Sequence, residues 1–156
     1  MFRAMRRAKQ ALTQEECVQL LQAQPRGVLA VHGEDGYPYA LPLDHLYRQG
    51  KLYFHCAQQG HKLDAIRADA RVSYCVMDEG YRIEGEWPLH IQSVIVFGTV
   101  RALPYNEETE EILRALGQKY NPDPADVEEE IRKYRNSVLL LELTIDHMTG
   151  KRVKES

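Results

Sequence analysis

The chain has 156 residues and a mass of 18.0 kDa, the usual size of one compact domain, so we expect a single domain over residues 1–156. Its formal net charge of -3 argues against nucleic-acid binding, which normally requires a strong basic excess on one face. No stretch approaches the roughly 18 consecutive apolar residues of a membrane span, so no membrane partner is expected. The arm at 1–11 is basic but lacks the apolar stretch of a secretory signal, which favours a cytoplasmic protein.

The cysteines indicate neither a disulfide framework nor a metal site. Cys17, Cys56 and Cys75 are odd in number, widely spaced and outside any C-x-x-C arrangement. We therefore expect reduced thiols and no bound metal.

A helix followed by a hairpin is predicted near the start of the chain. In LTQEECVQLLQA, Thr13 and Glu16 have the spacing of a capping box, which predicts a helix over about 14–23. GVLAVHG at 27–33 is typical of a short buried strand, and GEDG at 33–36 of a hairpin turn.

Two prolines mark the next strand as unusual. Because proline cannot donate to a strand ladder, Pro38 and Pro42 indicate that 37–50 is an edge or bulged strand that bends sharply. KLYFHCA at 51–57 is rich in aromatic and apolar residues and predicts a third strand. We expect these first three strands to form a meander.

The middle of the chain alternates between helix and strand patterns. HKLDAIRAD at 61–69 has apolar residues at helical spacing, whereas 72–80 returns to a strand pattern. Residues 80–90 have no clear period and are expected to form an ordered loop, in which Trp87 either covers a ligand or plugs the end of a barrel. SVIVFGTVRAL at 93–103 has the composition of a fully buried strand.

Two helices and a strand complete the prediction. Residues 106–120 and 123–135 each begin with a capping residue and carry glutamates near the start, where the helix dipole favours negative charge. We therefore interpret these glutamates as helix-start electrostatics and not as paired catalytic carboxylates. SVLLLELTIDHM at 137–148 predicts the last strand, and 148–156 is expected to be a basic, exposed tail.

The order of these elements favours a mainly β fold with peripheral helices. About six strands and four helices do not alternate regularly, which argues against a doubly wound parallel sheet. A small six-stranded antiparallel barrel with helices on its outside fits better, because closing a barrel removes exposed strand edges.

The stretch YFHCAQQGHKLDAI places a glycine and two basic side chains where a strand gives way to a helix. A helix start offers free N–H groups and a partial positive charge, so it is a natural seat for an anion. Here Gly60 allows close backbone approach, His61 can donate a hydrogen bond, and Lys62 adds a charge, which suggests a phosphate site. The alternative is that Gly60 only turns the chain and Lys62 is an ordinary solvated lysine.

Several segments together resemble a known family. YPYALPLDHLY, LYFHCAQQGHKLD and SVIVFGTV, with an MRR near the start and a TGK near the end, resemble the FMN-binding split-barrel proteins related to pyridoxamine 5′-phosphate oxidase. Within that family they are similar to the Nim-type branch, which is linked to nitroimidazole resistance. The similarity keeps the same order from about residue 6 to residue 151.

This resemblance implies a homodimer of two split barrels with FMN in each of two clefts at the interface. It implies that the flavin phosphate lies near the helix start described above and that the proline-containing strand faces the ring. Lys151 would reach the site of the partner subunit. The cofactor-binding residues it implies are Ala40, Leu41, Pro42, Leu43, His55, Cys56, Ala57, Gly60, His61, Lys62, Ser93, Val94 and Lys151.

Two of these positions also have simpler interpretations. His55 ends an aromatic strand and could be a packed rim histidine, but the resemblance places it facing the flavin or a substrate. Because strand side chains alternate in direction, Cys56 should face away from His55 and act as a small buried filler.

We therefore predict an FMN-dependent oxidoreductase that accepts electrons from a nicotinamide and reduces a small electron-poor acceptor such as a nitroimidazole. His55 is the predicted catalytic residue, since imidazole can exchange a proton near neutral pH. Pyridoxamine phosphate oxidation itself is not expected, because the additional arginines for the substrate phosphate have no counterpart. The alternatives are a flavin-storage or sensing protein without turnover, and a barrel that binds no cofactor and only mediates association.

Overall fold

The structure is a computed structural model that describes residues 1–155. The helices are α1 (Gln14–Ala23), α2 (His61–Ala68), α3 (Glu107–Tyr120) and α4 (Pro124–Tyr134), with short 3-10 turns η1 (Ala8–Gln10) and η2 (Glu34–Gly36). The strands are β1 (Arg26–His32), β2 (Pro38–Asp44), β3 (Leu46–Arg48), β4 (Lys51–Ala57), β5 (Arg71–Met77), β6 (Leu89–Leu103) and β7 (Val138–Glu155).

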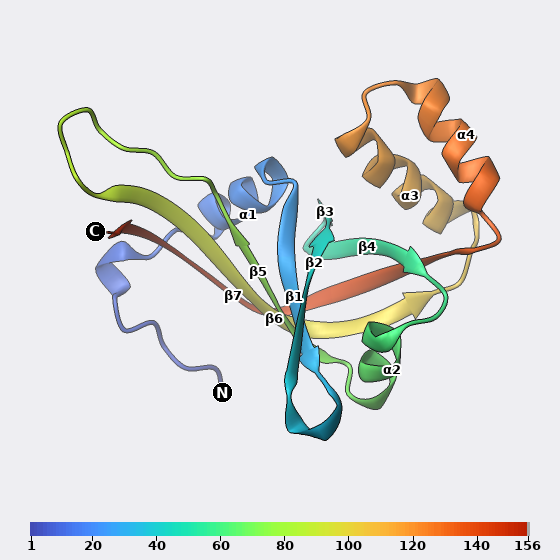
Figure 1. The fold of residues 1–156 in the computed structure, drawn as a ribbon, viewed down its shortest axis with the longest axis horizontal. Coiled ribbons are helices and arrows are strands. Elements are labelled where there is room, and N and C mark those ends of the chain that lie inside the picture. Colours follow the sequence, from blue (N-terminus) through green and yellow to red (C-terminus); the bar gives the residue numbers. More distant parts are fainter. Residues whose placement is uncertain (156) are drawn as a thin grey trace.

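All seven strands belong to one curled antiparallel sheet in the order β2-β1-β5-β6-β7-β4-β3. Figure 1 shows α3 and α4 together beside β4, whereas the loop between β5 and β6 extends from the opposite end of the molecule. The predicted mainly β fold with peripheral helices is confirmed.

The helices begin at the residues that the sequence predicts. Glu16 N donates to Thr13 Oγ1 at 3.2 Å and Thr13 N donates to Glu16 Oε2 at 2.8 Å, which completes the capping box of α1. Asn106 caps α3 in the same reciprocal way, and Asp123 caps α4 just before Pro124. The glutamates at the start of α3 lie in its first turn, as the helix dipole favours.

The barrel interior is filled from alternate positions of the strands. Leu29, Phe54, Tyr74, Val96 and Leu141 are each completely buried there, and α1 and α2 add apolar side chains to the same core. A second, smaller cluster forms on the other side of β4, where α3 packs against the strand. Its buried members are Tyr53, Ile112, Leu113 and Leu140.

The two outermost strands of the sheet, β2 and β3, are joined by His45 alone, so this residue brings the two edges of the curled sheet together. Its side chain is completely buried, with Nε2 2.6 Å from Leu21 O and Nδ1 2.8 Å from Tyr74 Oη. Because the Leu21 carbonyl only accepts, Nε2 carries the hydrogen and Nδ1 is an acceptor. The single hydroxyl hydrogen of Tyr74 lies within reach of two acceptors, His45 Nδ1 at 2.8 Å and Leu43 O at 2.7 Å. The carbonyl of His45 accepts from Lys119 Nζ and from Tyr120 Oη, both at 2.8 Å.

The predicted number of strands is wrong. The proline-containing segment is an edge strand as predicted, but the bend at His45 divides it into β2 and β3, which raises the strand count to seven. The expected pairing of neighbours along the chain is present, because β1 pairs with β2 and β4 pairs with β3, on the two sides of the bend. β4 also pairs with β7.

The expected loop and tail are also shorter than predicted. β6 begins at Leu89, and residues 89–92 pair with 152–155, so the part of the expected basic tail that the structure describes is strand. Gly150 and Val153 are buried in this strand, whereas Lys151, Arg152 and Lys154 are exposed, and these charged residues concealed the strand in the sequence. Ser156 lies outside the described residues. Trp87 is 78% exposed and does not plug the barrel end.

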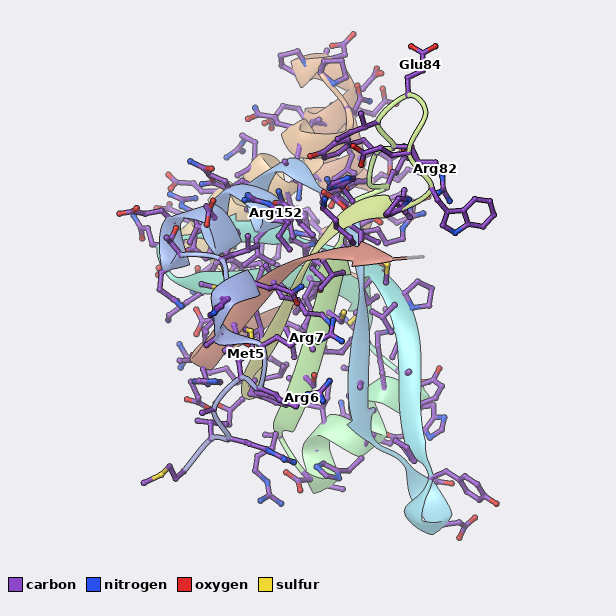
Figure 2. The ribbon with its side chains drawn as sticks, turned by 90° about the vertical axis from the view of Figure 1, so that its left-hand side faces the viewer. Met5, Arg6, Arg7, Arg82, Glu84 and Arg152 are labelled. Atoms are coloured by element: carbon purple, nitrogen blue, oxygen red, sulfur yellow. The ribbon has the colours of Figure 1, made fainter. Side chains whose placement is uncertain are left out.

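The basic N-terminal arm lies along the sheet. Leu12 N donates to Gly150 O at 2.9 Å, and the ring of Phe2 stacks on His147 with 4.6 Å between centroids. Figure 2 shows Met5, Arg6 and Arg7 on this arm, and Arg152 beside α1, where its guanidinium lies 3.2 Å from the carboxylate of Glu16.

Burial at the His45 bend predicts a specific pH dependence of stability. Burial lowers the pKa of His45 from 6.5 to about 4, with a smaller lowering from Lys119 and an opposing effect of Asp44. Between pH 6.5 and 4 the unfolded chain therefore binds a proton that the folded protein does not, and the free energy of unfolding falls with falling pH by up to about 3 kcal/mol. Urea unfolding at several pH values should show this slope in the wild type and lose it in His45→Gln. The exposed His32 provides the control: His32→Gln should keep the slope, and an equal slope in His45→Gln would contradict the assignment.

Candidate functional site

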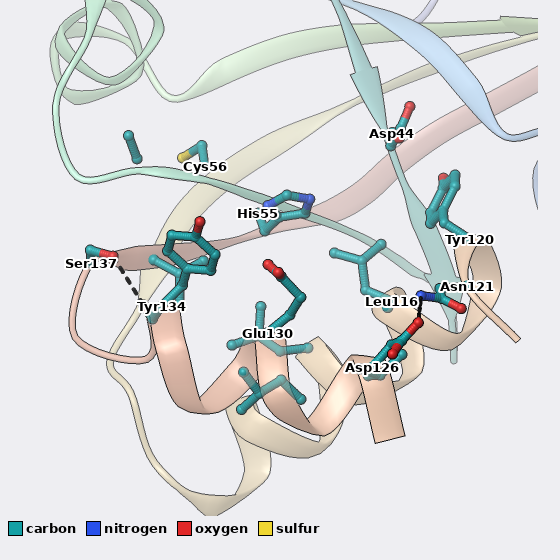
Figure 3. Close-up of a pocket in the computed structure, with 16 residues that line it drawn as sticks. Asp44, His55, Cys56, Leu116, Tyr120, Asn121, Asp126, Glu130, Tyr134 and Ser137 are labelled. Carbon is teal, nitrogen blue, oxygen red and sulfur yellow. Dashed lines mark hydrogen bonds between the residues drawn. The ribbon is translucent and has the colours of Figure 1, made fainter. Parts of the chain in front are cut away.

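Two adjoining cavities lie beside β4. The larger, of about 630 Å³, lies between β4 and the α3–α4 pair and opens to solvent, and the smaller, of about 340 Å³, lies between β4 and the end of β2. Asp44 and His55 line both of them, so these two residues mark the boundary. Figure 3 shows His55 on β4 above the two helices. The larger volume lies within the range of small-molecule sites.

Strand alternation decides which β4 side chains reach these cavities. Tyr53 faces α3, and His55 and Ala57 follow it at two-residue intervals and are exposed. Phe54 and Cys56 face the opposite way and pack in the barrel core, although Cys56 also borders the larger cavity. Burial raises the pKa of the Cys56 thiol, with a smaller opposing effect of Lys62, so this thiol is protonated at neutral pH. The expected opposite facing of His55 and Cys56 is therefore present.

Beyond β4 the chain reaches the start of α2, where the predicted anion seat lies. Gly60 is the N-cap residue with a φ of 141°, a backbone conformation that strains any L side chain, and no side chain caps the helix. The ring of the exposed His61 stacks on Tyr39 at 4.1 Å between centroids, and Lys62 is half-buried. An uncapped helix start with a lysine is a donor set that fits a phosphate.

The end of β2 forms the other wall of the smaller cavity. Pro42 and Leu43 line it together with Arg26 and Asp44. The side chains of Arg26 and Asp44 form an ion pair, with 2.5 Å between Nε and Oδ1. Strand β2 is an edge strand that pairs only with β1, so one row of its main-chain groups has no strand partner. Ala40 lies on the exposed side of β2, and Leu41 is half-buried on the side that faces the barrel core.

The remaining predicted residues lie elsewhere. Ser93 and Lys151 are direct cross-strand partners on the outer side of the sheet and line neither cavity. Val94 is completely buried in the barrel core. The structure therefore brings Pro42, Leu43, His55, Cys56 and Ala57 to the two cavities and leaves Ser93, Val94 and Lys151 apart, so the roles of these three residues toward a cofactor stay predictions.

The wall that α3 and α4 contribute was not predicted from the sequence. Tyr120, Asn121, Asp126, Glu130 and Tyr134 line the larger cavity, and no local motif marks them as site residues. The apolar stripes of both helices were visible in the sequence, but where the helices pack is a tertiary property. One signal was available in retrospect: a Cβ at Gly117 would lie 2.8 Å from Val127 Cγ1, so this glycine permits the close approach of the two helices.

The titratable groups of the cavities and their surroundings do not form a metal site: within residues 1–155 no group of three or more potential ligands is present. All three cysteines in that range are free thiols. In the same range no helix is both long enough and apolar enough to cross a membrane.

A curled antiparallel sheet with a helix pair packed on β4 places the chain among the split-barrel proteins. A profile of the family described as pyridoxamine 5′-phosphate oxidase matches residues 13–152, so the chain belongs to this family. The family resemblance seen in the sequence is thereby confirmed.

Solved structures with the same fold agree with this assignment. A proposed 5-nitroimidazole antibiotic resistance protein from Bacteroides thetaiotaomicron is 17% identical in sequence and superposes with a TM-score of 0.78. The match covers 92% of this chain and 87% of that protein's chain. An FAD and haem binding protein from Mycobacterium smegmatis is 24% identical with a TM-score of 0.73, covering 92% and 72%. An FAD-binding protein from Mesorhizobium loti is 24% identical with a TM-score of 0.66, covering 92% and 96%. Comparison with curated proteins gave no match.

Proposed function

We propose that this protein is an FMN-dependent oxidoreductase that takes electrons from a nicotinamide and passes them to a small electron-poor acceptor such as a nitroimidazole. The observation that supports it most is the layout of β4. The exposed His55 borders both cavities, and the chain runs on from it to the uncapped start of α2 at Gly60. Membership of the pyridoxamine 5′-phosphate oxidase family and the flavin-binding names of structural neighbours support a flavin.

In this proposal the helix start holds the phosphate of the cofactor through Gly60, His61 and Lys62, and the main chain of Pro42 and Leu43 borders its ring. A bound flavin supplies the two-electron chemistry that protein side chains lack. Reduction of a nitro group to a nitroso group consumes a hydride and a proton and releases water. The nicotinamide provides the hydride, and His55 delivers the proton from solvent to an acceptor oxygen.

The larger cavity favours turnover over flavin storage. An enzyme needs open space beside the reactive group, whereas a storage protein can cover both faces of its ligand with side chains. Here about 630 Å³ lies open next to His55. This space is large enough for an acceptor the size of a single heteroaromatic ring.

We also propose that two copies of the chain assemble through one surface, which we call the outer sheet face. It is the side of the sheet opposite the barrel core, where neighbouring strands carry rows of exposed and half-buried side chains. Its apolar members include Val28, Met77, Ile95 and Phe97, which are 39%, 53%, 39% and 40% exposed. Its further members are Ala30, Ala40, Pro42, Ser73, Cys75, Ser93, Thr149 and Lys151. A continuous apolar patch on a small protein is typical of an interface.

The predicted site residues support the same assembly. Pro42 and Thr149 lie at the two ends of one row that passes through Val28, Cys75 and Ile95, so four strand spacings, or about 19 Å along the sheet, separate β2 from β7. Lys151 of the same copy is therefore far from Pro42. Contact of one cofactor with both residues is therefore expected to involve two copies.

Lys62→Ala should weaken FMN binding. Removing a charged hydrogen-bond donor from the phosphate costs about 1.5 to 3 kcal/mol, which raises the dissociation constant about 10- to 150-fold. Quenching of FMN fluorescence in a titration at moderate salt measures this constant. Arg67→Ala removes the same charge from the other end of α2 and should leave it nearly unchanged. Equal constants for Lys62→Ala and the wild type would remove Lys62 from the site.

Turnover by the FMN-loaded protein separates the enzyme from its alternatives. Under anaerobic conditions a reduced nicotinamide should bleach the flavin absorbance, and a nitroimidazole should restore it. His55→Gln should slow the restoration at least about 100-fold, the usual minimum contribution of a general acid, with little change in FMN affinity. His32→Gln is the matched control. A flavin that the nitroimidazole does not reoxidise would support storage, and a protein that binds no FMN would support association alone.

Sedimentation equilibrium tests the proposed assembly. The wild type should have twice the chain mass of 18.0 kDa, and Ile95→Glu, which puts a charge in the middle of the outer sheet face, should have the mass of one chain. Tyr37→Glu, at the exposed hairpin tip, should remain dimeric. A wild type that sediments as one chain at micromolar concentration would contradict the proposal.

A further inference from the structure

The larger cavity, which we call the hairpin pocket, has an apolar floor and a polar rim. The floor consists of aliphatic side chains from the facing sides of α3 and α4 and from the start of β7: Leu113, Leu116, Val127, Ile131 and Val138. Tyr120 and Tyr134 stand at the rim. A floor of this kind suits a flat apolar molecule, because burying its surface is favourable wherever the polar groups of the ligand still reach partners at the rim.

The charged groups of the hairpin pocket are all acidic. Asp44, Asp126 and Glu130 line it, and neither lysine nor arginine is among the lining residues. The potential inside such a pocket favours positively charged ligands and opposes anions. A phosphate ester in this pocket would meet three carboxylates and no lysine or arginine to pair with.

Two of these carboxylates already have partners. Asp44 is paired with Arg26 at 2.5 Å. Asp126 lies in the first turn of α4, where the helix dipole stabilises a negative charge, and Asn121 Nδ2 lies 3.3 Å from its carboxylate.

Glu130 has neither kind of compensation. It lies beyond the first turn of α4, and within residues 1–155 its carboxylate forms no ion pair. Figure 3 shows this carboxylate extending from α4 toward His55 across the pocket. It is therefore the lining acid that is available to a ligand held between the helix pair and β4.

The nearby cations are engaged elsewhere. Lys119 Nζ donates to Gln24 O and His45 O, both at 2.8 Å, on the side of α3 that holds the β2–β3 bend. Lys133 Nζ lies over the ring of Tyr134, 4.9 Å from its centroid, and partly offsets the charge of Glu130. The hairpin pocket therefore keeps a modest preference for positively charged over negatively charged ligands.

We propose that the hairpin pocket binds the substrate of this protein and that this substrate is a flat apolar compound with a positively charged nitrogen, held by Glu130, and not a phosphate ester. Calling the ligand a substrate depends on the proposed function, but the charge preference of the pocket does not. His55 at one wall and Glu130 at the other define a direction, because the charged end of the ligand lies toward α4 and the rest of the ring lies toward β4.

Three probes that share one ring and differ in charge test this assignment: 1-naphthylmethylamine, 1-naphthalenemethanol and 1-naphthoate. Isothermal titration calorimetry of the full chain, with and without FMN, measures their dissociation constants at low salt. The amine should bind about tenfold more tightly than the naphthoate, with the alcohol between them, because one carboxylate at the rim separates the charge states by about this factor.

Variants connect the preference to this pocket. In Glu130→Gln the dissociation constant of the amine should approach that of the alcohol, and the constant of the alcohol should not change. Glu129 is a neighbouring acid on α4 that does not line the pocket, so Glu129→Gln should give the constants of the wild type. Ser137→Trp, which fills the pocket from its edge, should weaken the binding of all three probes.

Equal affinities of the three probes, tighter binding of the naphthoate, or an amine preference that persists in Glu130→Gln would each overturn the proposal. Occupation of the pocket by a second copy of the chain would appear as no binding of any probe, which also overturns it. If the amine preference holds in a protein that does not bind FMN, the pocket stands and only the proposed function fails.

Discussion

The fold depends on one buried bend at His45. The chain passes from one edge of the curled sheet to the other through a single residue between β2 and β3. The bend stays in place because its side chain and main chain bond to three separate elements: Leu21 of α1, Tyr74 of β5 and the end of α3. A buried imidazole with both nitrogens paired avoids the cost of an unsatisfied polar group.

This bend also sets the position of both cavities. Asp44, which lines each of them, is the residue just before it, and Tyr120, which lines the larger one, donates to its carbonyl. Lys119 bonds to the same carbonyl, and burial lowers the pKa of its ammonium to about 8, so it remains mostly charged at neutral pH. The end of α3 is thus fixed relative to β2, and the pocket wall is as rigid as the bend that anchors it.

How much the sequence could predict follows from the range of each interaction. Capping residues, prolines and glycines act within a few positions of the chain, so Thr13, Asn106 and Pro124 marked helix starts correctly. The pairing of β4 with β7 joins Lys51 to Thr144, and no local pattern encodes a partner so distant. The same limit explains the α3–α4 wall, since an apolar stripe shows that a helix packs but not against which element.

Opposite charges near the C-terminal end of β4 give the proposed site a polarity. The helix start at Lys62 is suited to an anion, whereas the pocket beside His55 and Ala57 is lined by Glu130 and other acids. A phosphate tail is favoured at the helix start and opposed in the pocket, and a cationic group has the reverse preference. His55 lies on the exposed side of β4. Strand alternation gives it this place, and Ala57, which follows on the same side, has a small side chain.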